Sequence, residues 1–243
     1  LPFIKVTPFR GHIGFAGVIL LGALLLMLPI STNGRNVTPF NETLFTATSA
    51  VCVTGLVAVD TGTTFSLFGQ ITLLALIQIG GLGFMAFATL TMVLLGRKIG
   101  LRDRMLLRES MNTSGLSGLV RLTRWYLTAA LVIEGGGAVL LAIRFVPLLG
   151  WGKGVYFSIF HAISAFCNAG FDVLADVDAG GSLCRYATDP VVNFTIMALI
   201  IIGGLGFAVW GDIRHNRRFS RMSVYTRLVI LITTVLIFGG AGI

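Results

Sequence analysis

Charged residues are scarce in this sequence, and their scarcity argues against a soluble fold. Only 12% of the 243 residues are Asp, Glu, Lys or Arg, and the mean hydropathy is +0.90; an ordinary soluble domain carries about 25% charged residues. Residues 61–96 and 191–211 contain no charged side chain at all. About 20 apolar residues suffice to cross a bilayer as a helix. Because the apolar runs are continuous and not alternating, the sequence predicts an all-α integral membrane protein.

Cysteine is also rare, which bears on metal binding and catalysis. Cys52, Cys167 and Cys184 form no CxxC pair and show no ligand-like spacing with histidine, so neither a zinc site nor a disulfide framework is predicted. A membrane-embedded enzyme using Cys52, Cys167 or His161 is the alternative from another functional class. It would need a base, an orienting group and a water path, and the sequence shows no consistent set of these. We therefore expect no enzymatic activity and no cofactor.

Basic residues outnumber acidic ones by 18 to 10, and their placement indicates topology. Fourteen of the 18 precede the first apolar run, lie in two connectors, residues 97–124 and 212–222, or closely follow the second connector, as Arg227 does. The positive-inside rule puts these connectors in the cytoplasm of a multi-pass plasma (inner) membrane protein. No aromatic residues are interleaved with them as a stacking platform, so no nucleic-acid partner is predicted. Instead, the connectors are expected to be a docking surface for a regulatory protein.

The apolar segments differ in length. Five are long enough to be membrane helices and are predicted at residues 12–30, 65–96, 122–146, 190–211 and from about 224 onward. The second is long enough to protrude into the cytoplasm. Two others, residues 39–50 and 153–166, are too short to span and suit re-entrant half-helices. Basic clusters flank each pair of long helices, so each short segment must enter and leave the membrane on the outer side.

The chain repeats itself. LFTATSAVCVTGL at residues 44–56 matches IFHAISAFCNAGF at residues 159–171 with an offset of 115, and IGGLGF at 79–84 recurs at 202–207. Both copies run in the order helix, half-helix, loop with glycine, helix, and in the same orientation. The sequence thus predicts parallel repeats in residues 1–120 and 121–222, with residues 223–243 starting a third.

A glycine-containing loop after a half-helix can select ions. Main-chain carbonyls at membrane depth are tolerated only when buried in protein or lining water, and a row of them can replace the hydration shell of K⁺. The carboxyl end of the half-helix adds partial negative charge, and glycine allows the carbonyls to face inward. The alternative is that each loop is only a turn that lets helices pack, and the presence of two matched copies of the loop disfavours it. The predicted filter residues are Val53, Thr54, Gly55, Asn168, Ala169 and Gly170, with Cys52 and Cys167 just below them.

These stretches resemble the Trk/Ktr/HKT superfamily of potassium transporters, and most closely its Ktr-type ion-translocating subunit. The resemblance rests on LPIST (28–32), FTATSAVCVTGLVAVDTGTTFSLFGQ (45–70), IQIGGLGFM (77–85), RKIGL (97–101) and FHAISAFCNAGF (160–171). It implies a K⁺-channel-like fold with four repeats around one pore, of which this chain holds the first two, so we expect it to be part of a longer subunit. It further implies a symporter or channel for K⁺, with Na⁺ as a coupling or activating ion. The implied partners are membrane lipid, the remaining two repeats, a second copy in a homodimer, and a cytosolic ring of nucleotide-binding regulatory subunits.

Several residues have more than one interpretation. The IGGLGF glycines are expected to serve close helix packing, and the cysteines beside the filter to be small buried supports. His161 is expected to be a packing histidine with its hydrogen bonds satisfied, in preference to a proton relay. For Glu134, a functional carboxylate and an internally hydrogen-bonded one are equally favoured. Three acids follow the second loop: Asp172, Asp176 and Asp178. They either raise the cation concentration at the mouth of the pore or simply belong to a solvated loop, and the second interpretation is slightly favoured.

A third function remains open at this point. A non-conducting structural or assembly subunit would also be apolar and helical, and it would not need a complete ring of carbonyls. Uptake in a potassium-uptake-deficient cell separates this possibility from a conducting subunit.

Overall fold

The computed structural model describes residues 7–34, 37–83, 119–176 and 182–241. In these ranges the chain is all-helical apart from one antiparallel bridge between Thr32 and Phe65. Within the described ranges, two helices are long and apolar enough to cross a membrane, or three if a bent pair is counted as one span. The predicted all-α membrane fold agrees with this. The predicted cytoplasmic protrusion and the docking connector at residues 97–118 lie outside the described ranges.

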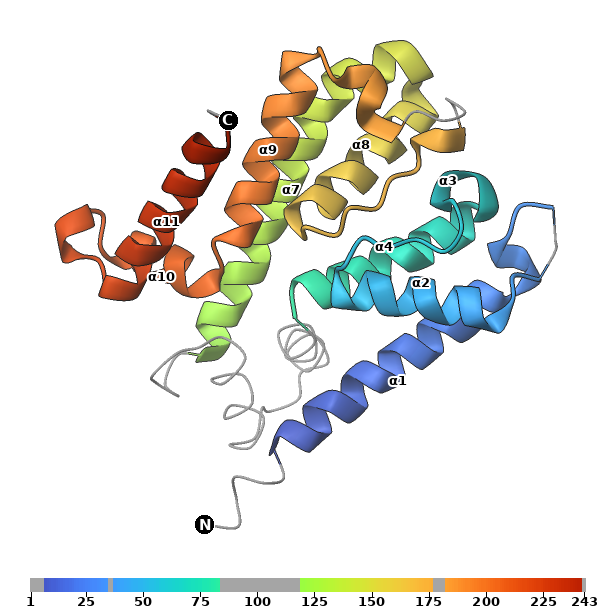
Figure 1. The fold of residues 1–243 in the computed structure, drawn as a ribbon, viewed down its shortest axis with the longest axis horizontal. Helices are drawn as coiled ribbons and strands as arrows, with labels where there is room; N and C mark the ends of the chain where they lie inside the picture. Colours follow the sequence, from blue (N-terminus) through green and yellow to red (C-terminus); the bar gives the residue numbers. More distant parts are fainter. Residues whose placement is uncertain (1–6, 35–36, 84–118, 177–181, 242–243) are drawn as a thin grey trace.

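The first half of the chain forms one group of helices that pack on one another. It consists of α1 (Thr7–Met27), the 3-10 turn η1 (Pro29–Ser31), α2 (Phe40–Cys52), the short α3 (Thr61–Thr64) and α4 (Leu67–Gly81). Helices α1, α2 and α4 pack on one another (Figure 1). The short predicted segment 39–50 is thus a helix of 13 residues, as expected.

The second half follows the same order of long helix, half-helix, loop and helix. It consists of α7 (Leu119–Leu149), α8 (Trp151–Phe166), η2 (Leu174–Asp176), η3 (Ser182–Tyr186), α9 (Pro190–Gly204), α10 (Phe207–His215), η4 (Phe219–Arg221) and α11 (Val224–Ala241). Helix α8 packs against α7 and α9, and α4 also contacts α8 (Figure 1). The two halves therefore meet through α4 and α8.

Two predicted helices are shorter than expected because their third IGGLGF glycine breaks them. Residues 190–211 do not form one helix: α9 ends at Gly204, Gly206 has φ 83°, and α10 leaves at an angle of 88°. In the first half α4 ends at Gly81, and Gly83 has φ 79°. Only glycine adopts such backbone angles without strain. The predicted continuous spans 65–96 and 190–211 are therefore wrong at these points.

The first IGGLGF glycine has the packing role that the sequence predicts. A Cβ at Gly80 would collide with the main-chain carbonyl of Val51 in the last turn of α2. A Cβ at Gly203 would collide with the carbonyl of Phe166 at the end of α8. Helix α4 can thus approach the end of α2, and α9 the end of α8, only because the glycine at this position lacks a side chain.

Polar side chains fix the helix ends outside the apolar segments. Asp189 caps α9 by accepting hydrogen bonds from the Val191 and Val192 amides, and it pairs with Arg144 Nε at 2.7 Å. In α10, hydrogen bonds from Thr226, Asn216 and Ser223 to the Asp212 carboxylate hold its pKa well below its usual range. The Asp189 contacts tie α9 to α7, and the Asp212 contacts tie α10 to the start of α11.

Candidate ion-conducting site

Both half-helices end in the same backbone conformation. The residue after the last turn, Val53 in one half and Asn168 in the other, is left-handed with φ 57° and 58°. Its amide donates to the carbonyl of Ala50 or Ala165, at 3.3 and 3.0 Å. A non-glycine residue rarely adopts this conformation, and valine is among the least suited. Its occurrence at equivalent positions shows that each loop is held by its surroundings.

The next residues of the two loops, Thr54 and Ala169, also make equivalent hydrogen bonds. The Thr54 amide donates to Ser49 O at 3.0 Å, and the Ala169 amide donates to Ser164 O at 2.8 Å. These bonds close the helix ends in the manner of a Schellman motif.

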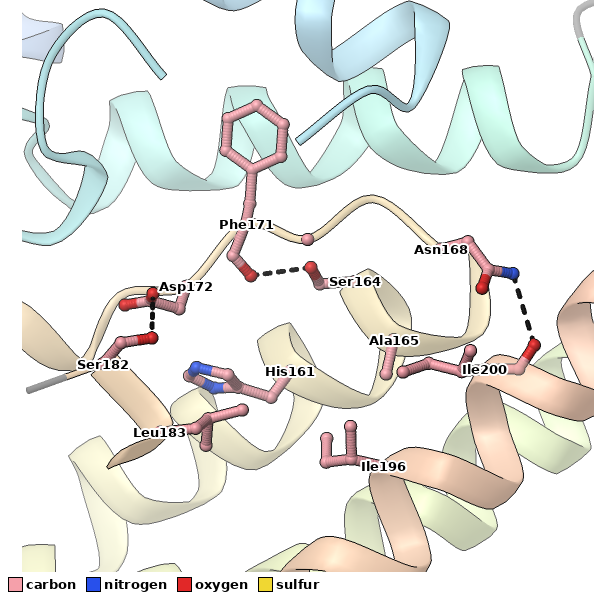
Figure 2. Close-up of a pocket in the computed structure, with 11 residues that line it drawn as sticks. His161, Ser164, Ala165, Asn168, Phe171, Asp172, Ser182, Leu183, Ile196 and Ile200 are labelled. Carbon is pink, nitrogen blue, oxygen red and sulfur yellow. Dashed lines mark hydrogen bonds between the residues drawn. The ribbon is translucent and has the colours of Figure 1, made fainter. Parts of the chain in front are cut away.

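The serine hydroxyls of the half-helices also hold the loops, although through different bonds. Ser49 Oγ accepts a hydrogen bond from Thr54 Oγ1 at 2.9 Å, whereas Ser164 Oγ donates to the Phe171 carbonyl at 2.6 Å. Figure 2 shows the second of these bonds across the loop after α8. The two loops are therefore anchored to their own half-helices by matched residues.

The two predicted filter glycines lie against each other. Gly55 and Gly170 have φ 73° and 71°, and a Cβ on Gly55 would lie 2.7 Å from the Ala169 carbonyl oxygen and 3.5 Å from Gly170 Cα. Loops that are 115 residues apart in the sequence thus converge at one place. This convergence places Gly55 beside Ala169 and Gly170 of the other loop.

The cysteines beside the loops have different environments. Cys167 follows α8 directly and is 8% exposed, and a Cβ on Gly81 of α4 would collide with its sulfur. Cys52, the last residue of α2, is exposed. Cys167 is therefore buried as expected, with α4 of the first half against it, whereas Cys52 is exposed in the part of the chain that the structure describes.

Glu134 is internally hydrogen-bonded, which was one of its two interpretations. It is 3% exposed, and Gln78 Nε2 lies 3.0 Å from each of its carboxylate oxygens. The Cys167 thiol lies 3.8 Å from Gln78 Oε1. The chain of contacts joins α7, α4 and the start of the second loop. Sequence reasoning missed Gln78, although an amide in the apolar segment before IGGLGF was a signal.

Removing one partner of this pair should destabilise the protein. Gln78→Leu leaves the Glu134 carboxyl buried without its donor, which we expect to lower the free energy of unfolding by about 1–3 kcal/mol. The double variant Gln78→Leu/Glu134→Leu should regain most of the loss, because two apolar groups replace both partners. Thermal unfolding of the full-length protein in detergent measures this. Thr72→Leu, at a position on the same helix away from this pair, is the control, and equal stability of all variants would contradict the pairing.

His161 is packed in the core as the sequence favours, but it is not fully satisfied, because among the described residues its Nε2 has no hydrogen-bond partner. It is 2% exposed, Nδ1 lies 2.7 Å from the Phe157 carbonyl, and three phenylalanine rings surround it edge to face. Asp172, in contrast, is not simply solvated. Its carboxylate accepts hydrogen bonds from Ser182 Oγ at 2.5 Å and from the Leu174 amide at 3.2 Å. Asp176 ends η2, and Asp178 lies outside the described residues.

Comparison with known proteins decides the family. The family model described as TrkH, cation transport protein, matches residues 7–240. The chain belongs to this family. The resemblance to the Trk/Ktr superfamily is thereby confirmed, and the family is one of transporters and not of enzymes.

Individual relatives agree with this assignment. The chain is 48% identical over 237 residues to Ktr system potassium uptake protein B of Bacillus subtilis, covering 97% of this chain and 52% of the relative. It is 43% identical over 227 residues to potassium/sodium uptake protein NtpJ of Enterococcus hirae, covering 93% and 49%. With Ktr system potassium uptake protein B of Vibrio alginolyticus it shares 42% over 231 residues, covering 94% and 49%. The chain spans about half the length of these relatives.

Proposed function

We propose that this chain forms two repeats of the pore of a potassium uptake protein. Main-chain oxygens of its two glycine-containing loops would replace water around K⁺ in a selectivity filter. In this proposal residues 1–120 and 121–222 are the repeats, and residues 223–243 begin a third. The contributing residues are Val53, Thr54, Gly55, Asn168, Ala169 and Gly170, with Cys52 and Cys167 at the inner ends of the loops.

One observation carries the proposal. The loops have matching left-handed residues, matching amide-to-carbonyl bonds and matching positive-φ glycines, and Gly55 meets Gly170. Equivalent loops that face a common point are what a pore assembled from repeats needs. The half-helices end at these loops, so the negative ends of their dipoles lie where a cation would bind. If the loops were only packing turns, they would not need to converge on one point.

The relatives' names support the transported ion. Two of them are called potassium uptake proteins and one a potassium/sodium uptake protein. Potassium is therefore the proposed substrate, with Na⁺ as a coupling or activating ion. Family resemblance adds the other proposed elements: two further repeats, a homodimer, and a ring of nucleotide-binding subunits on the cytoplasmic side. The basic connectors would face those subunits, by the positive-inside rule.

Uptake by cells tests the proposal against a purely structural subunit. Expressed at full length in a strain that lacks its own potassium uptake, the protein should restore growth at low external K⁺. Rubidium or potassium uptake should saturate with ion concentration. The control is the same protein with Gly55→Ser and Gly170→Ser together, at equal membrane abundance. Growth that stays at the level of the empty strain would contradict a conducting role.

A further inference from the structure

A cavity lies behind the second glycine-containing loop. It has a volume of about 270 Å³ and is bounded by α8, the loop, η3 and α9 (Figure 2). Apolar side chains of Leu183, Ile196 and Ile200 form one part of its wall. The imidazole of His161 points toward the part where Asp172 and Ser182 lie.

The histidine presents a free lone pair in this cavity. Its Nδ1 lies 2.7 Å from the Phe157 carbonyl, which can only accept, so Nδ1 carries the proton. In the neutral imidazole Nε2 is then an acceptor. Among the described residues, Nε2 is the buried side-chain nitrogen or oxygen without a hydrogen-bond partner. Burying a polar atom without a hydrogen-bond partner costs free energy. We therefore expect a hydrogen-bond donor to lie next to Nε2 in the cavity.

The neighbouring groups define what that donor is. The Asp172 carboxylate accepts two hydrogen bonds, from Ser182 and Leu174, and retains capacity for more. A bridging molecule must therefore donate to both Nε2 and the carboxylate, and it must fit among apolar side chains. Water meets both conditions, since buried water typically makes about three hydrogen bonds to otherwise unpaired groups. Potassium does not, because a hard cation prefers oxygen ligands to imidazole.

We propose that this cavity binds water that links His161 Nε2 to Asp172 and so positions the second loop. Asp172 follows Gly170 by two residues, and Ser164, on the next turn of α8 after His161, holds the Phe171 carbonyl at 2.6 Å. The water and the serine together fix the outer end of the loop to α8. His161 is thus a positioning residue, and its role in ion selection rests on the proposed function of the loop as a filter.

The first half of the chain lacks this arrangement. At the position equivalent to His161 stands Thr46, whose hydroxyl donates to the Glu42 carbonyl of its own helix at 2.8 Å. Val57 occupies the position equivalent to Asp172. The water-mediated support is therefore specific to the second loop, and Thr46 offers a matched control.

The test compares ion preference in full-length variants. His161→Leu keeps an apolar side chain of similar size without the lone pair, and it should lower the ratio of apparent affinities for K⁺ over Na⁺ by about fivefold, the factor typical of one neutral hydrogen bond. His161→Gln retains an acceptor and should restore most of the ratio. Thr46→Val should leave it unchanged. Asp172→Val removes the carboxylate acceptor and introduces the residue type that stands at the equivalent position of the first loop, Val57. It should act as His161→Leu does, and it replaces His161→Leu in the test if that variant does not accumulate.

Each result decides between the alternatives. Unchanged preference in His161→Leu or Asp172→Val, while Gly170→Ser alters it, would overturn the positioning role and leave the filter intact. Unchanged preference in all of these variants would overturn both. A Gln variant no better than Leu would also contradict the hydrogen bond. A high-resolution density map of the full-length protein should show water within hydrogen-bond distance of Nε2, and an empty cavity would refute the proposal.

Discussion

Replacing Gly55 with Ser should reduce the preference of the full-length protein for K⁺ over Na⁺ by roughly 5- to 150-fold, and Gly170→Ser should have a smaller effect in the same direction. A non-glycine residue at φ 73° or 71° costs about 1–3 kcal/mol, so the loop relaxes and its carbonyls move. At Gly55 the new Cβ would also lie 2.7 Å from the Ala169 carbonyl oxygen, whereas at Gly170 the nearest atom is 3.5 Å away. Steric conflict therefore adds to strain only at Gly55.

The measurement is uptake of each ion over a range of concentrations, in cells with matched amounts of protein. Gly34→Ser is the control for backbone strain alone, because Gly34 has φ 86°, a Cβ there would meet nothing within 4 Å, and the residue lies outside the loops. Gly34→Ser should lower stability without altering ion preference. If neither loop variant changed the apparent affinities, the filter assignment would be wrong. If Gly170→Ser had the larger effect, the steric argument would fail.

Residues 1–243 expressed alone should give no K⁺-selective flux, whereas the full-length protein should. A filter needs carbonyls from about four directions to replace a hydration shell, and the two converging loops supply two. The exposed backbone of the loops would otherwise meet lipid, where each unpaired polar group costs several kcal/mol. The family resemblance implies that two more repeats complete the ring, and the relatives that match are about twice as long.

Flux into proteoliposomes measures this difference directly. Both proteins are reconstituted at equal density, and the double variant Gly55→Ser/Gly170→Ser of the full-length protein serves as the low-selectivity reference. Robust selective flux from residues 1–243 would overturn the four-repeat expectation. It would instead indicate that two copies, each with two loops, assemble into a pore.

The half-helices were the most predictable elements. Segments of 12 and 14 apolar residues between long runs are too short to span a membrane, and they fold as α2 and α8 with ends within two residues of the predicted ones. The repeat of their sequences predicted equivalent loops, since matched residues in matched surroundings adopt matched conformations. Gly55 and Gly170 share nearly the same φ for this reason.

Other features were outside the reach of sequence patterns. Apolar periodicity continues through IGGLGF, so hydropathy predicts one helix where Gly206 ends it and α10 turns away. Hydropathy predicts which residues are removed from water, but it does not predict which glycine adopts a positive φ. Burial of the two cysteines also differs: α4 contacts Cys167, whereas Cys52 is exposed, although both occupy the same position of the repeat.

The sequence by itself determined the membrane class, the family, the order of the elements and the residues of the two loops. These follow from local composition and from repetition, which are properties of the chain alone. Tertiary structure decided which distant residues meet: Gly55 with Gly170, Gln78 with Glu134, and His161 with a cavity shared by Asp172. The physical reason is that packing of the elements sets these contacts, which join residues 115 positions apart for Gly55 and Gly170 and 56 apart for Gln78 and Glu134. Whether a buried carboxylate or imidazole finds a partner depends on that packing and not on its neighbours in sequence.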